Sequence, residues 1–203
     1  AFKSLLSKAF VPTLTSFDYG KFNGNWKLSA AEGLISVAVF LDDRRLYNQA
    51  LAMWRERTHA YVYLSTDGDL PVPPANDAGK HQTPTELGCQ WLDNKAKACR
   101  ASPATDPGVR FQNGQSQESC RDFGHASMGL GGIINTAETA WIQGEDLYGE
   151  EQDRIVTGVL YAIQIAQTYD SRGWPAGFCA NADELSSSLS LSELPVDTVY
   201  NAY

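Results

Sequence analysis

The sequence predicts an all-α protein built from antiparallel helical hairpins. Apolar residues recur at helical spacing in four long stretches, which cover residues 28–41, 44–60, 117–143 and 150–169. Short polar turns separate the first two stretches and the last two, which is typical of antiparallel helix pairs. The segments between the pairs are rich in Pro, Gly and Asn, as loops are.

The first hairpin has the clearest pattern. Residues 28–41, "LSAAEGLISVAVFL", place Leu28, Ile35 and Leu41 near one helical face. The sequence "DDRR" then makes a polar turn, and helical spacing resumes over 44–60. The short connection predicts that the two helices run antiparallel.

The remaining elements are shorter. Residues 61–84 begin with alternation and end in Asp-Gly and prolines, which predicts a short extended piece followed by a loop. Residues 85–98 fit a short helix, and residues 101–116 fit a loop. "GEDLYGEE" makes the turn before the helix of 150–169, whereas residues 183–203 are weakly patterned.

Length and charge limit the function. The 203 residues suit one domain with a substantial core, and the net charge of −8 argues against a nucleic-acid partner, which needs a basic face. No apolar run approaches the ~20 residues that span a bilayer, so no membrane partner is expected. Ala1 is not a start methionine, so we expect a processed, truncated or partial chain. The one local basic concentration is expected on a solvated helix face: Arg44, Arg45, Arg55 and Arg57.

The four cysteines contain no CxxC pair, which argues against a zinc site. Their even number permits two disulfides and an oxidising, extracellular compartment. Of the three possible pairings, Cys89–Cys99 closes the shortest loop and leaves Cys120–Cys179. Four buried free thiols in a cytosolic protein are the alternative.

The stretch 117–132, "QESCRDFGHASMGLGG", gathers an acid, a guanidinium and an imidazole. In a helix, Glu118, Arg121, Asp122 and His125 would share one face, because residues three and four apart are neighbours. The simpler alternative is an exposed face carrying Glu118–Arg121 and Asp122–His125 contacts, each worth only about a few tenths of a kcal/mol.

Three blocks carry a resemblance to a known family. They are "NGNWKLSAAEGLISVAVFLDDRRLYNQAL" at 23–51, "YVYLSTDGDLP" at 61–71 and "QESCRDFGHASMGLGGIINTAETAWIQGEDLYG" at 117–149. In this order they resemble the alginate-lyase-like polysaccharide lyases, most of all the branch of glucuronan and alginate lyases. The final "VYNAY" is similar to a late block of the same domain.

The resemblance implies that residues 1–203 form part of an incomplete (α/α) toroid or barrel. The family's toroid has roughly twice as many helices, so the chain corresponds to its later half, with the N-terminal helices missing. The implied activity is carbohydrate degradation by a secreted lyase that cleaves a uronic-acid polysaccharide by β-elimination. The implied partners are an acidic polysaccharide and the remainder of the domain.

The chemistry of elimination explains the residue types. The C5 proton beside a uronate carboxylate becomes acidic only when the carboxylate charge is neutralised, so a donor must stabilise the developing enolate. By motif position, Asn25 and Arg121 are the expected neutralisers and His125 the base or co-neutraliser. Glu118 is expected to orient Arg121. Trp26 is expected either to stack on a sugar or to pack in the core.

The acid/base tyrosine has several candidates. Tyr61 and Tyr63 follow the first hairpin and lie near the loop that should border the cleft; each could equally have a core role. Tyr203 is a third candidate, and the tyrosine could also lie outside this sequence. No cofactor is expected, and His59 and His81 are too isolated to predict a metal site.

Two other functions remain open. A helical-toroid glycoside hydrolase would need two carboxylates across a cleft. The candidates for that pair are Glu118, Asp122, Glu145 and Asp146. The other alternative is a non-catalytic glycan-binding protein that retains the fold.

Overall fold

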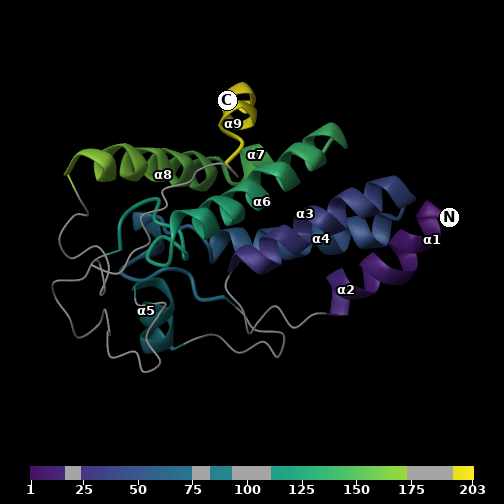
Figure 1. Ribbon diagram of the computed structural model, residues 1–203, viewed down its shortest axis with the longest axis horizontal. Helices are drawn as coiled ribbons and strands as arrows, with labels where there is room; N and C mark the ends of the chain where they lie inside the picture. Colours follow the sequence, from purple (N-terminus) through teal and green to yellow (C-terminus); the bar gives the residue numbers. More distant parts are fainter. Residues whose placement is uncertain (17–23, 75–82, 93–110, 173–193) are drawn as a thin grey trace.

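The computed structural model describes residues 1–16, 24–74, 83–92, 111–172 and 194–203. Within them the chain is all-helical, as predicted (Figure 1). The helices are α1 (Phe2–Leu5), a π-helical stretch (Leu6–Phe10), α2 (Val11–Ser16), α3 (Gly24–Leu41), α4 (Arg44–His59), a 3-10 turn (Ser65–Asp67), α5 (Pro84–Leu92), α6 (Phe123–Ile142), α7 (Leu147–Glu150), α8 (Gln152–Arg172) and α9 (Val196–Ala202).

The predicted hairpin is confirmed as α3 and α4, which lie side by side (Figure 1). A two-residue turn joins them. Asp42 adopts a positive φ of 58°, and Asp43 caps α4 by accepting a hydrogen bond from the Leu46 backbone N–H at 3.0 Å. Short acidic residues tolerate the left-handed region and satisfy the open amides at a helix start.

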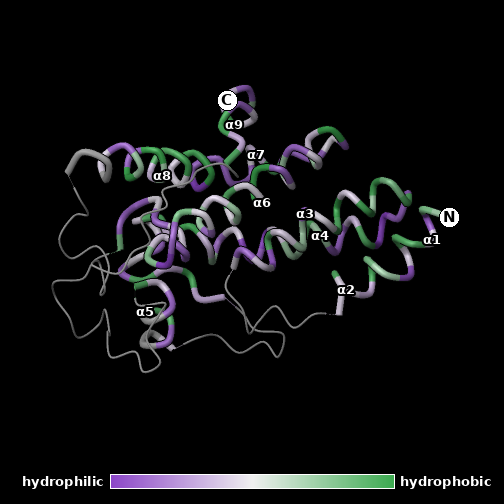
Figure 2. Tube along the Cα trace, in the orientation of Figure 1, coloured by the Kyte–Doolittle hydropathy of each residue, from purple (hydrophilic) through white to green (hydrophobic). Residues whose placement is uncertain are grey.

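Helix α6 packs across this hairpin and completes the core. The fully buried Trp54 of α4 donates its indole N–H to the backbone carbonyl of Ile133 at 2.9 Å. At Gly132 a Cβ would lie 3.0 Å from the backbone of Leu28, so glycine allows α3 and α6 to approach closely. Figure 2 shows that hydrophobic and hydrophilic residues alternate along the helices, as amphipathic packing requires.

The extended piece predicted after α4 is also present. The Tyr63 backbone N–H donates to the backbone carbonyl of Gln115 at 2.9 Å, and the Gln117 backbone N–H donates to the backbone carbonyl of Tyr61 at 2.8 Å. Val62 and Ser116 form an isolated antiparallel bridge between the two stretches. This pairing brings residue 117 alongside residue 61.

The predicted start of the third long helix was wrong. Residues 117–122 form turns, and α6 begins at Phe123 because Asp122 is its N-cap. Glu118 and Arg121 therefore precede the helix instead of sharing a helical face with His125. The chain is extended and bridged to Val62 at Ser116, and the first open amides of the helix are capped by Asp122, so α6 begins six residues later than predicted.

The other predicted elements agree with the structure where it describes them. Helix α8 matches the prediction for 150–169, and α5 matches the beginning of 85–98, whose residues after 92 lie outside the described part. Helices α1, α2, α7 and α9 were not predicted, and α7 lies in the stretch expected to be a turn. In the described part of the chain, no helix is long and apolar enough to span a membrane.

The expectation of one solvated basic face was partly wrong. Arg57 is 1 % exposed, with its Nε 3.8 Å from Glu56. Arg55 forms a bidentate ion pair with Glu150 at 2.6 and 2.9 Å, and so joins α4 to α7. Part of the basic concentration thus holds helices together.

Candidate functional site

The candidate site lies at the start of α6. The Asp122 carboxylate accepts a hydrogen bond from the His125 backbone N–H at 2.8 Å. The same carboxylate contacts the His125 ring nitrogen Nδ1 at 2.7 and 2.8 Å. With Nδ1 held in this way, Nε2 is the ring nitrogen that can exchange a proton with a ligand.

Asp122 is suited to hold the imidazole. Burial alone would raise the pKa of its carboxyl. Hydrogen bonds from His125, together with the electrostatic influence of His125 and Arg121, outweigh burial and lower that pKa. Asp122 is therefore ionised at neutral pH, and a carboxylate at Nδ1 favours the tautomer that carries its proton there.

Arg121 lies beside the Asp122–His125 pair and makes only long contacts with the neighbouring carboxylates. Its Nη1 is 3.5 Å from Glu118 and its Nε is 3.9 Å from Asp122, both at the long end of ion-pair distances. The Arg121 side chain is 32 % exposed, whereas the Glu118 side chain is fully buried. The simpler alternative of an exposed face correctly predicted the Glu118–Arg121 and Asp122–His125 contacts. It was wrong about Glu118, whose side chain is buried.

The start of α3 reaches the same region from a distant part of the sequence. Gly24 donates its backbone N–H to the side chain of Gln117 at 2.5 Å, across 93 residues. A Cβ at Gly24 would lie 2.5 Å from the ring of Tyr61. The start of α3, Tyr61 and the segment before α6 therefore pack together.

Asn25 and Trp26 follow directly in α3. Asn25 is 5 % exposed, and its Oδ1 has no hydrogen-bond partner in the described part of the chain. Trp26 is about half-exposed. The structure joins the segments that carry Asn25, Arg121 and His125; that their side chains share one ligand stays a prediction.

The two tyrosine candidates are buried and engaged. Tyr61 donates its hydroxyl to the backbone carbonyl of His125 at 3.1 Å, and burial, followed by the charge of Glu118, raises its pKa well above the ordinary value. Tyr63 donates to the carbonyl of Gly68 at 2.7 Å, and burial raises its pKa as well. Both placements fit the core role more readily than acid/base chemistry at a ligand. Tyr203 lies at the far end of the fold, where it donates to the carbonyl of Tyr148.

The carboxylates considered for a hydrolase do not form one site. Glu118 and Asp122 lie at the start of α6, whereas Glu145 and Asp146 follow its end. A helix of 20 residues is about 30 Å long. Paired carboxylates of glycosidases are within about 10 Å of each other. A catalytic pair therefore cannot consist of one carboxylate from each end of α6.

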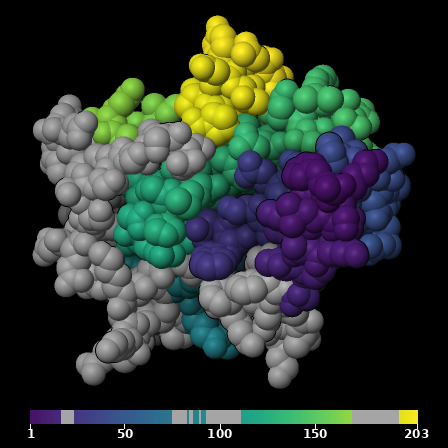
Figure 3. Space-filling view, turned by 45° about the vertical axis from the view of Figure 1, so that its right-hand side comes forward, coloured from purple at the N-terminus to yellow at the C-terminus, as the bar shows by residue number. Residues whose placement is uncertain are grey.

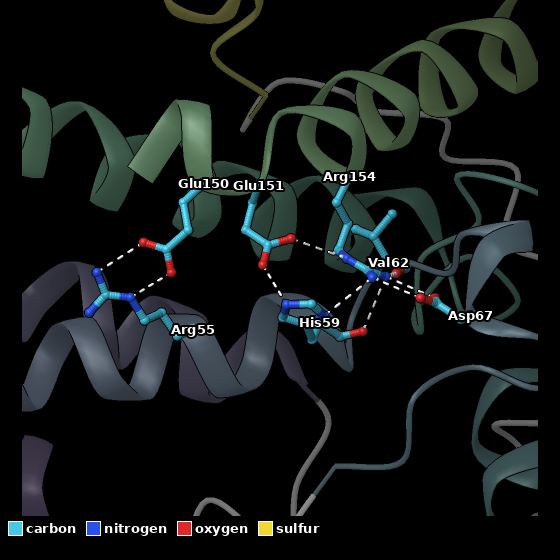
Figure 4. A network of polar contacts seen from close by, with 7 residues as sticks. All are labelled: Arg55, His59, Val62, Asp67, Glu150, Glu151 and Arg154. Atoms are coloured by element: carbon cyan, nitrogen blue, oxygen red, sulfur yellow. Dashed lines mark hydrogen bonds and ion pairs between the residues drawn. The ribbon is translucent and has the colours of Figure 1, made fainter. Parts of the chain in front are cut away.

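A second polar cluster anchors the segment after α4 (Figure 4). Arg154 of α8 donates to both carboxylate oxygens of Asp67 at 2.8 and 2.9 Å, and to the carbonyl of Val62 at 2.5 Å. Glu151 lies 3.3 Å from Arg154 and 2.5 Å from the His59 ring. These groups satisfy one another, so we assign the cluster a structural role.

Sequence reasoning missed the two polar residues that assemble the candidate site. Gln117 was not considered, although it caps α3 from a distance, and nothing local in the sequence indicates a contact across 93 residues. Asp122 was considered as a partner on a helical face and as a carboxylate of a hydrolase pair, but not as the N-cap of α6. Its position three residues before His125 is also an N-cap pattern, which could have located the helix start.

The predicted disulfides remain predictions. Cys120 is buried and is not a free thiol. The side chain of Cys89, together with Cys99 and Cys179, lies outside the described residues.

The fold and site define an all-α protein with an aspartate-held histidine next to a partly exposed arginine. Searches of protein-family models, curated proteins and solved structures gave no match. In the described part of the chain, no three His, Cys, Asp or Glu side chains come together as metal ligands.

Proposed function

We propose that the protein is a polysaccharide lyase that cleaves a uronic-acid polysaccharide, of the glucuronan or alginate type, by β-elimination. The observation that carries the proposal is the Asp122–His125 pair with Arg121 beside it. Both Arg121 and His125 are about one-third exposed, so a ligand can reach them. The resemblance of the surrounding motifs to alginate-lyase-like enzymes supports the same activity.

Each group has a defined task in this proposal. Arg121 pairs with the uronate carboxylate and stabilises the negative charge that develops when the C5 proton leaves. His125 Nε2 accepts that proton, and Asp122 stabilises the imidazolium that forms. The C4–C5 double bond forms as the C4–O4 bond breaks.

Two further groups complete the reaction. The His125 imidazolium passes its proton to the departing O4, which regenerates the base. At the start of α3, Asn25 donates a hydrogen bond from its side-chain amide to the uronate carboxylate of the substrate. The buried Oδ1 of Asn25, which has no partner among the described residues, is an acceptor, so it could take a hydrogen bond from a sugar hydroxyl but not bind the carboxylate.

The proposal includes the wider architecture. We propose that the hairpins form part of an incomplete (α/α) toroid, that the substrate is the acidic polysaccharide partner, and that the protein is secreted. A glycan cleft formed by paired helices would place the start of α3 and the start of α6 on the same wall. Those two helix starts are joined through Gly24 and Gln117.

Incubation of the protein with glucuronan, alginate and pectate tests the proposal. A lyase generates an unsaturated chain end that absorbs ultraviolet light. A hydrolase generates reducing ends without that absorbance, and a glycan-binding protein generates neither. Absence of the ultraviolet signal on all three polymers, with the protein folded by circular dichroism, would reject β-elimination on this class of substrate.

A further inference from the structure

A pocket of about 510 Å³ lies at the other end of α6 from the candidate site. It is formed by the end of α6, by α7, by the first residue of α8 and by α9. Its lining includes Glu138, Trp141, Asp146, Tyr148, Asp197 and Tyr203. Figure 3 shows the C-terminal segment (yellow) projecting beside the green surface of the end of α6.

The pocket is acidic. Glu138, Asp146 and Asp197 come from three different elements, and the described lining contains no Lys, Arg or His. Burial, followed by the charges of Asp146 and Asp153, raises the pKa of Tyr203 to about 12. Negative charge at this end of the fold would repel a polyuronate, so the pocket is not an extension of the proposed lyase site.

Aromatic rings form the other part of the wall. Tyr148 and Tyr203 meet edge to face, with ring centroids 5.8 Å apart. The Trp141 side chain is 55 % exposed although the residue lines a pocket. An exposed indole beside carboxylates is a favourable surface for a cation, which is attracted to the ring face.

The arrangement favours an organic cation over a metal ion. No three metal-ligating side chains converge in the described part of the chain. Two of the carboxylates are already fixed in place, because Tyr148 donates its hydroxyl to Glu138 at 3.1 Å and Gly149 donates its N–H to Asp146 at 2.7 Å. The volume lies in the range of about 300–1,000 Å³ that is typical of small-molecule sites.

We propose that this pocket binds a small organic cation, a protonated primary amine on a body of about monosaccharide size. The ammonium group would lie between Asp197 and the Trp141 ring. Thr198, Asn201 and Gln152 supply hydroxyl and amide groups that could bind polar substituents of the ligand. An amino sugar and an aliphatic diamine share the recognised ammonium group. The proposal does not depend on the lyase activity.

Isothermal titration calorimetry on the whole chain tests this binding directly. The probes are glucosamine and putrescine at neutral pH, where both are cationic, with N-acetylglucosamine and glucuronate as probes that lack the positive charge. We expect saturable binding of at least one amine and none of the uncharged or anionic sugars. Tighter binding of glucosamine than of putrescine would indicate an amino sugar, and the reverse order an aliphatic amine.

Variants locate the site. Asp197→Asn removes one carboxylate charge and Trp141→Ala removes the exposed ring; we expect each to weaken binding by about tenfold. Asp69→Asn and Phe40→Ala are matched controls, an exposed carboxylate and an exposed ring away from the pocket, and should leave the affinity unchanged. The proposal is overturned if neither amine binds saturably, if N-acetylglucosamine binds as well as glucosamine, or if both pocket variants bind like the unchanged protein.

Discussion

The hydroxyl of Tyr61 donates a hydrogen bond to the backbone carbonyl of His125 at 3.1 Å, across 64 residues of sequence. The buried ring thereby fixes the first turn of α6 against the segment that follows α4. Gly129, one turn further along α6, lies so close to the same ring that a Cβ would overlap it. The position of the candidate histidine thus depends on a buried aromatic contact.

Gly129→Ala should destabilise the protein, because the added methyl group overlaps the Tyr61 ring and its hydroxyl. Overpacking of this kind costs about 1–3 kcal/mol. Gly33→Ala is the matched control: it also replaces a helical glycine, but its Cβ would make an ordinary 3.5 Å contact with Leu14. That change should stabilise the protein by about 0.5–1 kcal/mol. Denaturant unfolding measures the free energy of unfolding of both variants. Equal changes in Gly129→Ala and Gly33→Ala would contradict the close packing of Gly129 against Tyr61.

Arg121→Ala should lower the turnover of polyuronate far more than it lowers stability. The lost guanidinium acts on charge that develops in the transition state, and removal of one such donor costs about a hundredfold to a thousandfold in rate. Arg45→Ala removes the same charge from an exposed position of α4 and should leave turnover unchanged. Ultraviolet absorbance of the products and a melting curve for each variant provide the two measurements. Wild-type turnover in folded Arg121→Ala would remove Arg121 from the mechanism.

Asp122→Asn separates the two roles of Asp122. Asparagine is an equally good N-cap, so stability should change by less than about 0.5 kcal/mol. The amide cannot stabilise an imidazolium, so turnover should fall by about a hundredfold and the rate should depend differently on pH. Asp43→Asn makes the same change at the N-cap of α4 and should retain full turnover. An unchanged pH–rate profile in Asp122→Asn would argue that His125 is not the base.

The Asp67–Arg154 pair should make stability depend on acid pH. Burial raises the pKa of Asp67, but hydrogen bonds from Arg154 and from the Leu64 backbone N–H outweigh it and lower that pKa below its ordinary value of 3.8. The stabilisation that the ionised Asp67 carboxylate contributes is therefore complete well above pH 3.8. It is lost as the pH falls through the pKa that Asp67 has in the folded protein.

Asp67→Asn should remove this dependence and destabilise the protein by about 1–3 kcal/mol at neutral pH, because the buried Arg154 loses its bidentate partner and, among the described residues, keeps only Glu151, at 3.3 Å, as a counter-charge. Asp69→Asn, in the same loop but exposed, should change the unfolding free energy by less than about 0.5 kcal/mol. Urea unfolding between pH 2 and 7 measures both. If Asp67→Asn and the unchanged protein have the same free energy of unfolding at neutral pH, the Asp67–Arg154 pair makes no net contribution to stability.

Local patterns predicted the long helices and could not predict how they meet. The hairpin of α3 and α4 follows from apolar spacing and the two aspartates between its helices, all of which are local in sequence. The start of α6 was misplaced because Ser116 lies in an extended bridge with Val62, a contact that no short window contains, and because Asp122 is the N-cap. Likewise, the partnership of Arg154 with Asp67 spans 87 residues, and nothing near either residue indicates the other.

The hydrogen bond from Trp54 to the Ile133 carbonyl has a consequence for synthesis on the ribosome. The two residues are 79 positions apart, so α3 and α4 emerge with the surface that α6 covers still open to water. At about 5–20 residues per second, α6 follows about 4–16 seconds later. Folding of this core therefore cannot be completed before α6 has been synthesised.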